Sequence, residues 1–323
     1  MINDSNFHYI YRLGKRTRPF FLSKKSKFYP HYTIDSKSNI INNELYELIE
    51  KGEPLMVTRF GSIESRAIVN YLEQRVVSTD LEGIFKYLTA QIGANWKKSS
   101  KYLDNLCKNS GFFPNDETLL SDFVQIYLES SKNIDILGVW NELEEYIPSI
   151  PQNTKLCNIR ELEPWFFDKP WSKALEGKKV LVIHPFEDTI KMQYDKRLNI
   201  YKNQDVLPLF ELKTIKAVQT IADEVSQFNT WFDALEYMKE EIDKIDFDIA
   251  ILGCGGYGLP LASYIKNKGK QAIHLGGVTQ LLFGIKGKRW EEWEHYTSLR
   301  GDAWVFSNEK PKGFDKIENG CYW

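Results

Sequence analysis

Four glycines lie close together near the C-terminal end of the sequence: Gly253, Gly255, Gly256 and Gly258. They follow a largely apolar run, residues 247–252, and precede a segment with helical character, an arrangement whose backbone amides can bind phosphate. A dinucleotide-binding fingerprint also needs an acidic residue roughly 20 positions further on, at the end of the next strand. Here that strand, residues 271–277, has no Asp or Glu, and the next acidic residue is Glu291. We therefore expect this glycine loop, residues 253–258, to bind a phosphate or a sugar and not NAD.

Two cations and a tryptophan follow the glycine loop in the sequence: Lys288, Arg289 and Trp290. The two cations can neutralise the charge of a bound diphosphate, and the flat ring of Trp290 suits the face of a sugar. A structural interpretation is equally open. In that case the glycines only form a tight turn, the cations are solvated and the tryptophan is part of the core.

A second candidate turn follows the first apolar run of the chain, residues 54–58, and has the sequence Arg59-Phe-Gly-Ser-Ile-Glu64. Gly61 allows the turn to tighten, Ser62 can cap the helix that follows, and Glu64 lies in its first turn. An acid at that position interacts favourably with the helix dipole by roughly 0.3 to 1 kcal/mol. The turn is therefore explained by helix formation alone or by ligand binding.

The elements that position these turns alternate along the chain. Short runs rich in Val, Ile and Leu predict strands at residues 54–61, 134–140, 155–159, 179–185, 248–253 and 271–275. Apolar residues at spacings of three and four predict helices between them, including one over residues 212–225 and one over 231–245. Strands separated by helices indicate a Rossmann-like α/β fold, with a mostly parallel sheet and helices on both faces.

Ligands of such sheets bind beyond the carboxyl ends of the strands, so polar residues at these ends are candidates for a site. Glu187 and Asp188 follow one strand, and either can take a proton from an acceptor. Asp188 also suits the cap of a helix that begins near Thr189. His184 and His274 can contact an acceptor or a sugar, although each follows apolar residues and also fits a histidine of the core.

Composition excludes several classes of protein. The chain has 323 residues and a formal net charge of −2, so no global field attracts nucleic acid. Its four cysteines are far apart and form no metal-binding pattern, which fits a reducing cytosol. No apolar run approaches the roughly 18 residues that span a bilayer, and no secretory signal pattern is present. We expect a cytoplasmic protein whose residues 41–323 form one domain.

Residues 1–40 differ from the rest of the chain because they carry eight Lys and Arg residues against two Asp residues, with aromatic residues between them. Cations beside aromatic rings suit an anionic membrane surface, where each cation contributes about 1 kcal/mol. This segment is therefore a candidate arm for peripheral contact with the inner membrane face. The alternative is a solvated arm that packs on its own domain.

The turn at residues 59–64 resembles the Arg-Phe-Gly-Asp-Gly-Glu turn of the GT-D type bacterial glycosyltransferases, which carries their Asp-x-Glu motif. Residues 248–258 and 271–276 are similar to the closing strand, glycine loop, helix and strand of that family. The resemblance implies a single Rossmann-like domain and a divalent cation, Mn²⁺ or Mg²⁺, near the donor diphosphate. Glu64 matches the glutamate of the motif, whereas Ser62 stands where its first aspartate belongs and is a poorer ligand for a hard cation.

The resemblance implies the transfer of a sugar from a nucleotide donor, linked to uridine diphosphate, to a glycan or lipid-linked acceptor. Such reactions build bacterial surface polysaccharides and glycoprotein glycans. Two alternatives remain from the residues themselves. One is an NAD(P)-dependent oxidoreductase or epimerase that uses the glycine loop, and the other is a non-catalytic nucleotide-binding partner, suggested by Ser62 in place of an acid. The sequence does not indicate the sugar, the acceptor or the oligomeric state.

Overall fold

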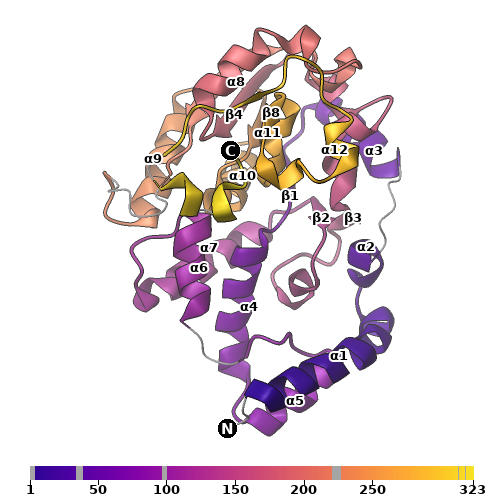
Figure 1. Ribbon diagram of the computed structural model, residues 1–323, viewed down its shortest axis with the longest axis vertical. Coiled ribbons are helices and arrows are strands. Elements are labelled where there is room, and N and C mark those ends of the chain that lie inside the picture. The colour runs from indigo at the N-terminus through magenta and orange to yellow at the C-terminus, as the bar shows by residue number, and fades with distance from the viewer. Residues whose placement is uncertain (1–3, 34–38, 97–99, 220–226, 312, 317) are drawn as a thin grey trace.

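The computed structural model describes residues 4–33, 39–96, 100–219, 227–311, 313–316 and 318–323 (Figure 1). Its centre is a seven-stranded sheet in which all neighbouring strands are parallel, in the order β3-β2-β1-β7-β6-β4-β5. The α/β, Rossmann-like fold class expected from the sequence is confirmed. The strands are β1 (Leu55–Thr58), β2 (Ile136–Val139), β3 (Lys155–Asn158), β4 (Lys179–His184), β5 (Glu211–Lys216), β6 (Ile249–Leu252) and β7 (Gln271–His274).

Helices cover both faces of the sheet, as its buried strands require. One face packs against α4 (Ser62–Val76), α6 (Lys101–Ser110), α7 (Leu120–Ser131), α9 (Trp231–Asp243) and α10 (Gly258–Asn267). The other face packs against α3 (Asn39–Lys51), α8 (Glu187–Tyr194), α11 (Thr279–Leu282) and α12 (Glu294–Thr297). Successive residues of β6 show the division, because Ile249 and Ile251 contact one core and Ala250 and Leu252 contact the other. A short parallel pair, β8 (Ile285–Lys286) and β9 (Val305–Phe306), lies outside the main sheet.

One predicted helix is wrong. The apolar residues Leu212 and Ile215, read as the start of a helix over residues 212–225, belong to strand β5 at the edge of the sheet. An edge strand exposes much of its surface, so its apolar residues do not form the continuous run that identified the other strands, and their spacing of three imitates a helix. The end of that predicted helix falls on residues 220–226, outside the described residues.

Two helices begin earlier than predicted. Helix α4 starts at Ser62 with Gly61 as its N-cap, so Ser62 is not the cap, while Glu64 lies in the first turn as expected. Helix α8 starts at Glu187 with Phe186 as its N-cap, so Asp188 is not the cap either. In both cases the helix begins immediately at the carboxyl end of its strand, and the polar side chains become part of the first turn.

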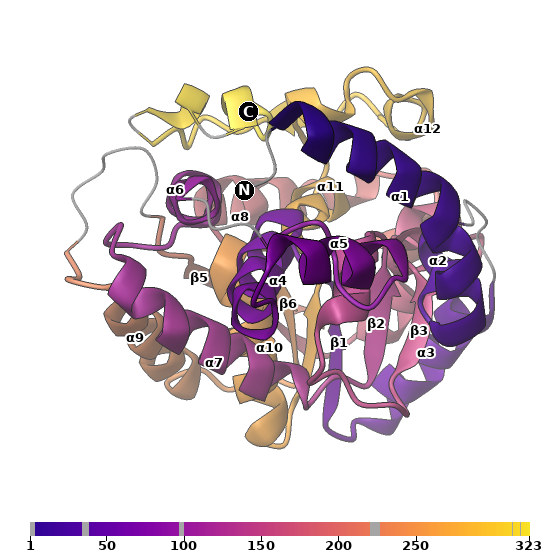
Figure 2. The same cartoon turned by 90° about the horizontal axis from the view of Figure 1, so that it is seen from below.

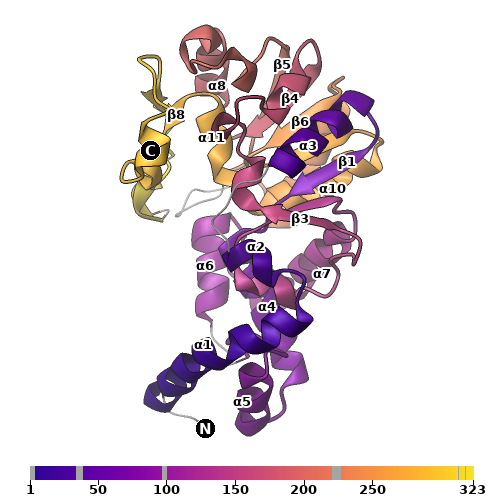
Figure 3. The same ribbon diagram turned by 90° about the vertical axis from the view of Figure 1, so that its right-hand side faces the viewer.

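A group of helices projects from the carboxyl-end side of the sheet (Figure 3). It consists of α1 (Asp4–Lys25), α5 (Asp80–Leu88) and the loop of residues 89–96, and we call it the helical extension. The rings of Phe7, Tyr87 and Trp96 pack together in it. Of the segment expected as an N-terminal arm, residues 1–40, the described residues 4–33 contain α1 and α2 (Tyr29–Thr33), with α1 packed against α5, and residues 39 and 40 begin α3. No helix in the described part of the chain is long and apolar enough to cross a membrane.

Polar contacts hold this extension to the rest of the chain. Arg18, on α1, is buried and donates hydrogen bonds to the carbonyls of Tyr87 and Ile92, at 3.1 and 2.9 Å. Glu73, near the end of α4, is buried and accepts hydrogen bonds from the amides of Gly93 and Asn95. Burial raises the pKa of Glu73 to about 7, against the opposing effect of those hydrogen bonds and of the nearby Arg18 charge.

We therefore expect stability to fall as pH rises across the range from about 4.5 to 7. In this range native Glu73 keeps a proton that the unfolded chain releases, so the free energy of unfolding decreases with pH, by up to about 3 kcal/mol from this residue. Glu73→Gln should flatten that part of the profile, measured by urea unfolding at several pH values. The exposed Glu129→Gln serves as the control, and an unchanged slope in Glu73→Gln would contradict the assignment.

Candidate functional site

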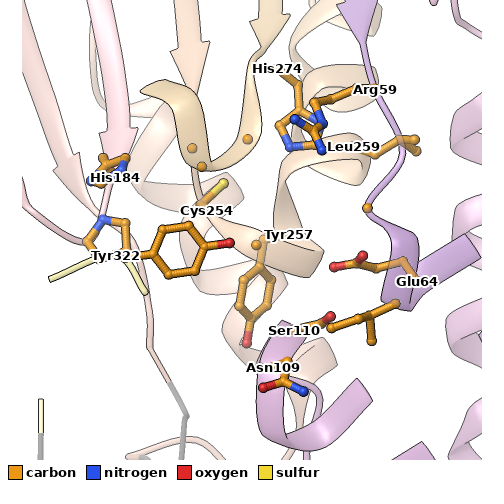
Figure 4. Close-up of a pocket in the computed structure, with 18 of the residues that line it drawn as sticks. Arg59, Glu64, Asn109, Ser110, His184, Cys254, Tyr257, Leu259, His274 and Tyr322 are labelled. Atoms are coloured by element: carbon orange, nitrogen blue, oxygen red, sulfur yellow. The ribbon is translucent and has the colours of Figure 1, made fainter. Parts of the chain in front are cut away.

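A pocket opens at the carboxyl edge of the main sheet (Figure 4). Its empty space, counted out to the open solvent, is about 1160 Å³. Residues that follow β1, β2, β4, β5 and β6, together with His274 at the end of β7, contribute to its walls. In Figure 4, Arg59 and Glu64 lie on one side of the pocket and His184 and Tyr322 on the other. The pocket therefore lies where ligands of parallel α/β sheets usually bind.

The pocket brings together most of the residues that the sequence singled out. Its walls include Arg59, Gly61, Ser62, Glu64, His184, Gly253, Gly255, His274 and Arg289. Other candidates do not line it: Gly256, Gly258, Glu187, Asp188, Lys288 and Trp290. The two candidate turns, distant in the sequence, thus form one site.

The glycine loop presents unused backbone donors to this pocket. Gly253 donates its amide to the carbonyl of Ile183 at 2.9 Å, which fixes the start of the loop. Gly255 has a φ of +55°, a left-handed conformation that favours glycine. No other described residue accepts a hydrogen bond from the amides of Cys254, Gly255 or Gly256. The consecutive amides of Cys254 and Gly255, two lining residues beside the start of α10, therefore form a site suited to an anion.

Side chains are excluded at both ends of the glycine loop by close packing. A Cβ atom on Gly253 would lie 2.6 Å from Cδ2 of His184, and one on Gly258 would clash with the ring of His274. A Cβ atom on Gly256 would lie 2.9 Å from the carbonyl oxygen of Ser110. Gly256 and Gly258 therefore shape the loop from behind the pocket, although they do not line it.

Both histidines are neutral at physiological pH. Burial lowers the pKa of His184 to about 3, and burial together with the charge of Arg59 lowers that of His274 to about 3. Nδ1 of His184 accepts a hydrogen bond from the amide of Phe186 at 3.0 Å, so Nε2 carries the proton. Nδ1 of His274 lies 2.9 Å from the hydroxyl of Thr58. His184 is therefore a hydrogen-bond donor and not a base.

Arg59 supplies a positive charge at the wall of the pocket. Its guanidinium lies over the ring of Trp140, 4.9 Å from the centroid, and that ring is held by a hydrogen bond of 2.8 Å from Nε1 to the carbonyl of Phe60. Burial lowers the pKa of Arg59, and nearby Tyr322 and Glu163 oppose the shift. An arginine still remains charged at neutral pH. The guanidinium of Arg59 forms no hydrogen bond or salt bridge with another described residue, which leaves its donors available to a ligand.

Glu64 is the only Asp or Glu among the described residues that line the pocket, and its side chain is buried. The carboxylate folds back over Gly61, where a Cβ atom would clash with it. Within the described ranges, no group of three or more His, Cys, Asp and Glu residues is arranged to hold a metal ion. A single carboxylate beside the hydroxyl of Ser62 does not make a preformed site for Mn²⁺ or Mg²⁺. The described residues that line the pocket thus offer a hard cation one carboxylate.

The structure places Glu187 and Asp188 outside the pocket, in the first turn of α8. Glu187 accepts hydrogen bonds from Lys191 and Thr214, at 2.8 and 2.6 Å, and Asp188 extends into solvent. The amides at this helix start bind the carboxylate of Glu309, which accepts from Thr189 at 2.8 Å. The sequence correctly placed Glu187 and Asp188 just after β4. The side chain of Glu187 is hydrogen-bonded outside the pocket, and that of Asp188 points into solvent.

Several pocket residues were not identified from the sequence: Asn109, Ser110, Tyr127, Tyr257, Tyr322 and Trp323. The hydroxyl of Tyr127 donates to the carbonyl of Gly256 at 2.7 Å and so supports the glycine loop. Tyr322 accepts a hydrogen bond of 3.0 Å from Arg289. These residues come from helices and from the C-terminal segment, and no local pattern marks them as neighbours of the strand ends.

Comparison of the chain with models of known protein families, with curated protein sequences and with solved structures found no match. The geometry of the pocket and the chemistry of its residues are therefore the basis for a functional proposal.

Proposed function

We propose that the protein is a glycosyltransferase that moves a sugar from a nucleoside diphosphate donor, of the uridine diphosphate type, to a glycan or lipid-linked acceptor. One observation carries the proposal. The unused amides of the glycine loop, the available guanidinium of Arg59 and the buried carboxylate of Glu64 all belong to one pocket. Anion-binding groups and a single acid are what the transfer of a sugar from a diphosphate requires.

The donor diphosphate is bound by the positively charged part of this pocket. Arg59 and the amides of Cys254 and Gly255 donate hydrogen bonds to its oxygens, and Arg289 adds a second cation at the wall. Charge-assisted hydrogen bonds of this kind are about twice as strong as neutral ones. The same groups stabilise the charge that develops on the diphosphate as it leaves.

Glu64 acts as the base in this proposal. The acceptor hydroxyl oxygen forms a bond to the anomeric carbon, the bond from that carbon to the diphosphate breaks, and Glu64 takes the hydroxyl proton. The diphosphate leaves with the electron pair of the broken bond. His184 is excluded as the base because its Nε2 already carries a proton, which leaves it to donate a hydrogen bond.

The NAD(P) alternative is not favoured by the observed geometry. In a dinucleotide-binding fold, a carboxylate at the end of the strand after the glycine loop binds a ribose hydroxyl. Here that strand is β7, and its last residue, His274, is buried against Gly258 and hydrogen-bonded with Thr58.

Donor binding tests the proposal directly. Calorimetric titration of the full chain with a panel of nucleotide sugars and nucleoside diphosphates should show binding, with uridine diphosphate compounds bound most tightly. Arg59→Gln should weaken this binding at least about tenfold, because a charged hydrogen bond is worth roughly 1.5 to 3 kcal/mol. Arg197→Gln, which also removes a guanidinium from an aromatic ring but lies outside the pocket, is the matched control. Binding of NAD(P) and of no nucleotide sugar would overturn the proposal.

Glu64→Gln should reduce turnover at least about a hundredfold, the scale expected for loss of a positioned base. The substitution keeps the shape of the side chain, so the melting temperature and the affinity for the donor diphosphate should change little. Product release from a labelled donor gives the rate, and Glu129→Gln, on an exposed helix surface, is the control. If activity survives while stability falls, Glu64 is a helix-dipole residue and not the base.

The cation requirement can be tested separately from turnover. Because the described pocket residues offer one carboxylate, the wild-type protein alone should not bind Mn²⁺ in a saturable manner. Ser62→Asp places a second carboxylate in the first turn of α4 and should produce measurable Mn²⁺ binding by calorimetry. Saturable one-site binding by the wild-type protein without a nucleotide would contradict this assignment of ligands.

A further inference from the structure

The outward face of helix α1 is both basic and apolar. From Ser5 to Thr33 the sequence contains no Asp or Glu. Its exposed cations are Arg12, Lys15, Arg16, Lys24 and Lys25. None of them forms a salt bridge with another described residue. Tyr9, Leu13 and Phe20 are exposed between them, at 72%, 39% and 57%.

Six of these residues, at positions 9, 12, 13, 16, 20 and 24, lie on one side of the helix, whereas Lys15 and Lys25 lie outside this face. Positions 9, 12, 16, 20 and 24, and positions 9, 13 and 16, follow one another at spacings of three or four, which places them along one face. Gly14, Arg18 and Leu22 repeat at intervals of four on the opposite side, and all three are buried. The packing of α1 on the molecule thus leaves its basic, aromatic face free.

Helix α5 adds apolar side chains at the same end of the molecule. Leu81 and Phe85, one helical turn apart, are 79% and 63% exposed, whereas Gly83 and Tyr87 face the interior of the helical extension. Seen from below, α1 and α5 run side by side on the near surface of the molecule (Figure 2). Large exposed apolar residues of this kind usually mark a contact surface.

We propose that the exposed faces of α1 and α5, which we call the α1–α5 surface, bind an anionic lipid membrane. Cations attract the lipid headgroups, while aromatic and aliphatic side chains enter the boundary between headgroups and acyl chains. The ammonium of Lys24 lies 3.8 Å from the ring centroid of Phe20, so charge and apolar surface are adjacent. A nucleic acid would bind the cations but would leave Leu81 and Phe85 in water, which favours the membrane.

The position of this surface relative to the pocket gives it a role in the proposed reaction. Helix α4 begins at the pocket with Ser62 and ends at Val76, just before α5. Its 15 residues span about 22 Å at roughly 1.5 Å per residue. A protein docked through the α1–α5 surface would therefore hold the pocket away from the membrane by a distance on the scale of the length of α4, facing a lipid-linked acceptor. This role rests on the proposed function, whereas membrane binding itself does not.

Vesicle sedimentation of the full chain tests the electrostatic part. The protein should sediment with phosphatidylcholine vesicles that contain phosphatidylglycerol but not with vesicles of phosphatidylcholine alone. Binding should weaken as the salt concentration rises, because screening limits the range of surface charge interactions to about 10 Å at 0.1 M salt. The triple variant Arg12→Gln, Arg16→Gln, Lys24→Gln should bind about a hundredfold more weakly, from roughly a fivefold contribution per cation. The matched control replaces the exposed Lys169, Lys196 and Lys202, outside this surface, with Gln.

A second variant tests the contribution of α5. Leu81→Ser with Phe85→Ser should weaken vesicle binding at least about tenfold, as expected when two large apolar side chains no longer enter the membrane, while the salt dependence persists. Both side chains are exposed, so circular dichroism and the melting temperature should be unchanged. Donor titration of every variant should match the wild type, which separates a failure of membrane binding from a failure of the proposed function.

Four results would overturn the membrane proposal. The first is equal sedimentation of the wild type with both vesicle types, and the second is equal binding by the triple variant and its control. The third is a concentration-dependent dimer in sedimentation velocity that Leu81→Ser with Phe85→Ser abolishes without changing vesicle binding. That last outcome would assign the α1–α5 surface to a second copy of the chain. Tight binding of RNA in place of vesicles would likewise exclude a membrane partner.

Discussion

The pocket depends on the passage of the glycine loop between two buried imidazoles. His184 ends β4 and His274 ends β7, the strands on either side of β6, and each ring occupies space that a side chain on Gly253 or Gly258 would need. Because burial lowers the pKa of both rings to about 3, they stay neutral and the core need not accommodate a charge. Close packing on both sides fixes the backbone between them. The unused amides of the loop are therefore held ready for an anion before any ligand arrives, which is the condition for effective electrostatic stabilisation.

Helix α4 joins this rigid site to a part of the molecule that is stabilised differently. Its first turn carries Glu64 into the pocket, and its last turns carry Glu73 into the helical extension. The described apolar cluster of the extension is small, and Arg18 and Glu73 satisfy several of its buried backbone groups. Burial of the charged form of a carboxyl group is unfavourable, and the raised pKa of Glu73 reflects this. These polar contacts, together with those of Lys27 to the carbonyls of Pro151 and Gln152, help to fix the position of the extension relative to the pocket.

The sequence predicted the sheet well because its inner strands are short runs of Val, Ile and Leu buried on both faces, a pattern that needs no tertiary information. It failed at β5, where exposure at the edge removed that pattern. The meeting of Arg59, Glu64 and the glycine loop followed from the rule that parallel strands end at a common edge. The roles of Asp188 and Tyr322 could not follow from any such rule. Whether an acid at a strand end faces the pocket depends on where the next helix begins, and the approach of a C-terminal residue depends on packing across the whole chain.

The residues that line the described pocket offer many hydrogen-bond donors and one carboxylate. Arg59 and the loop amides can only donate hydrogen bonds, and His184 is fixed as a donor by the amide of Phe186. Glu64 is the one carboxylate among the described lining residues. A ligand that fills this space should therefore be strongly anionic and should also present a group that can lose or share a proton. A sugar diphosphate beside an acceptor hydroxyl meets both conditions, whereas a dinucleotide would place its ribose against His274, which is neutral and already hydrogen-bonded.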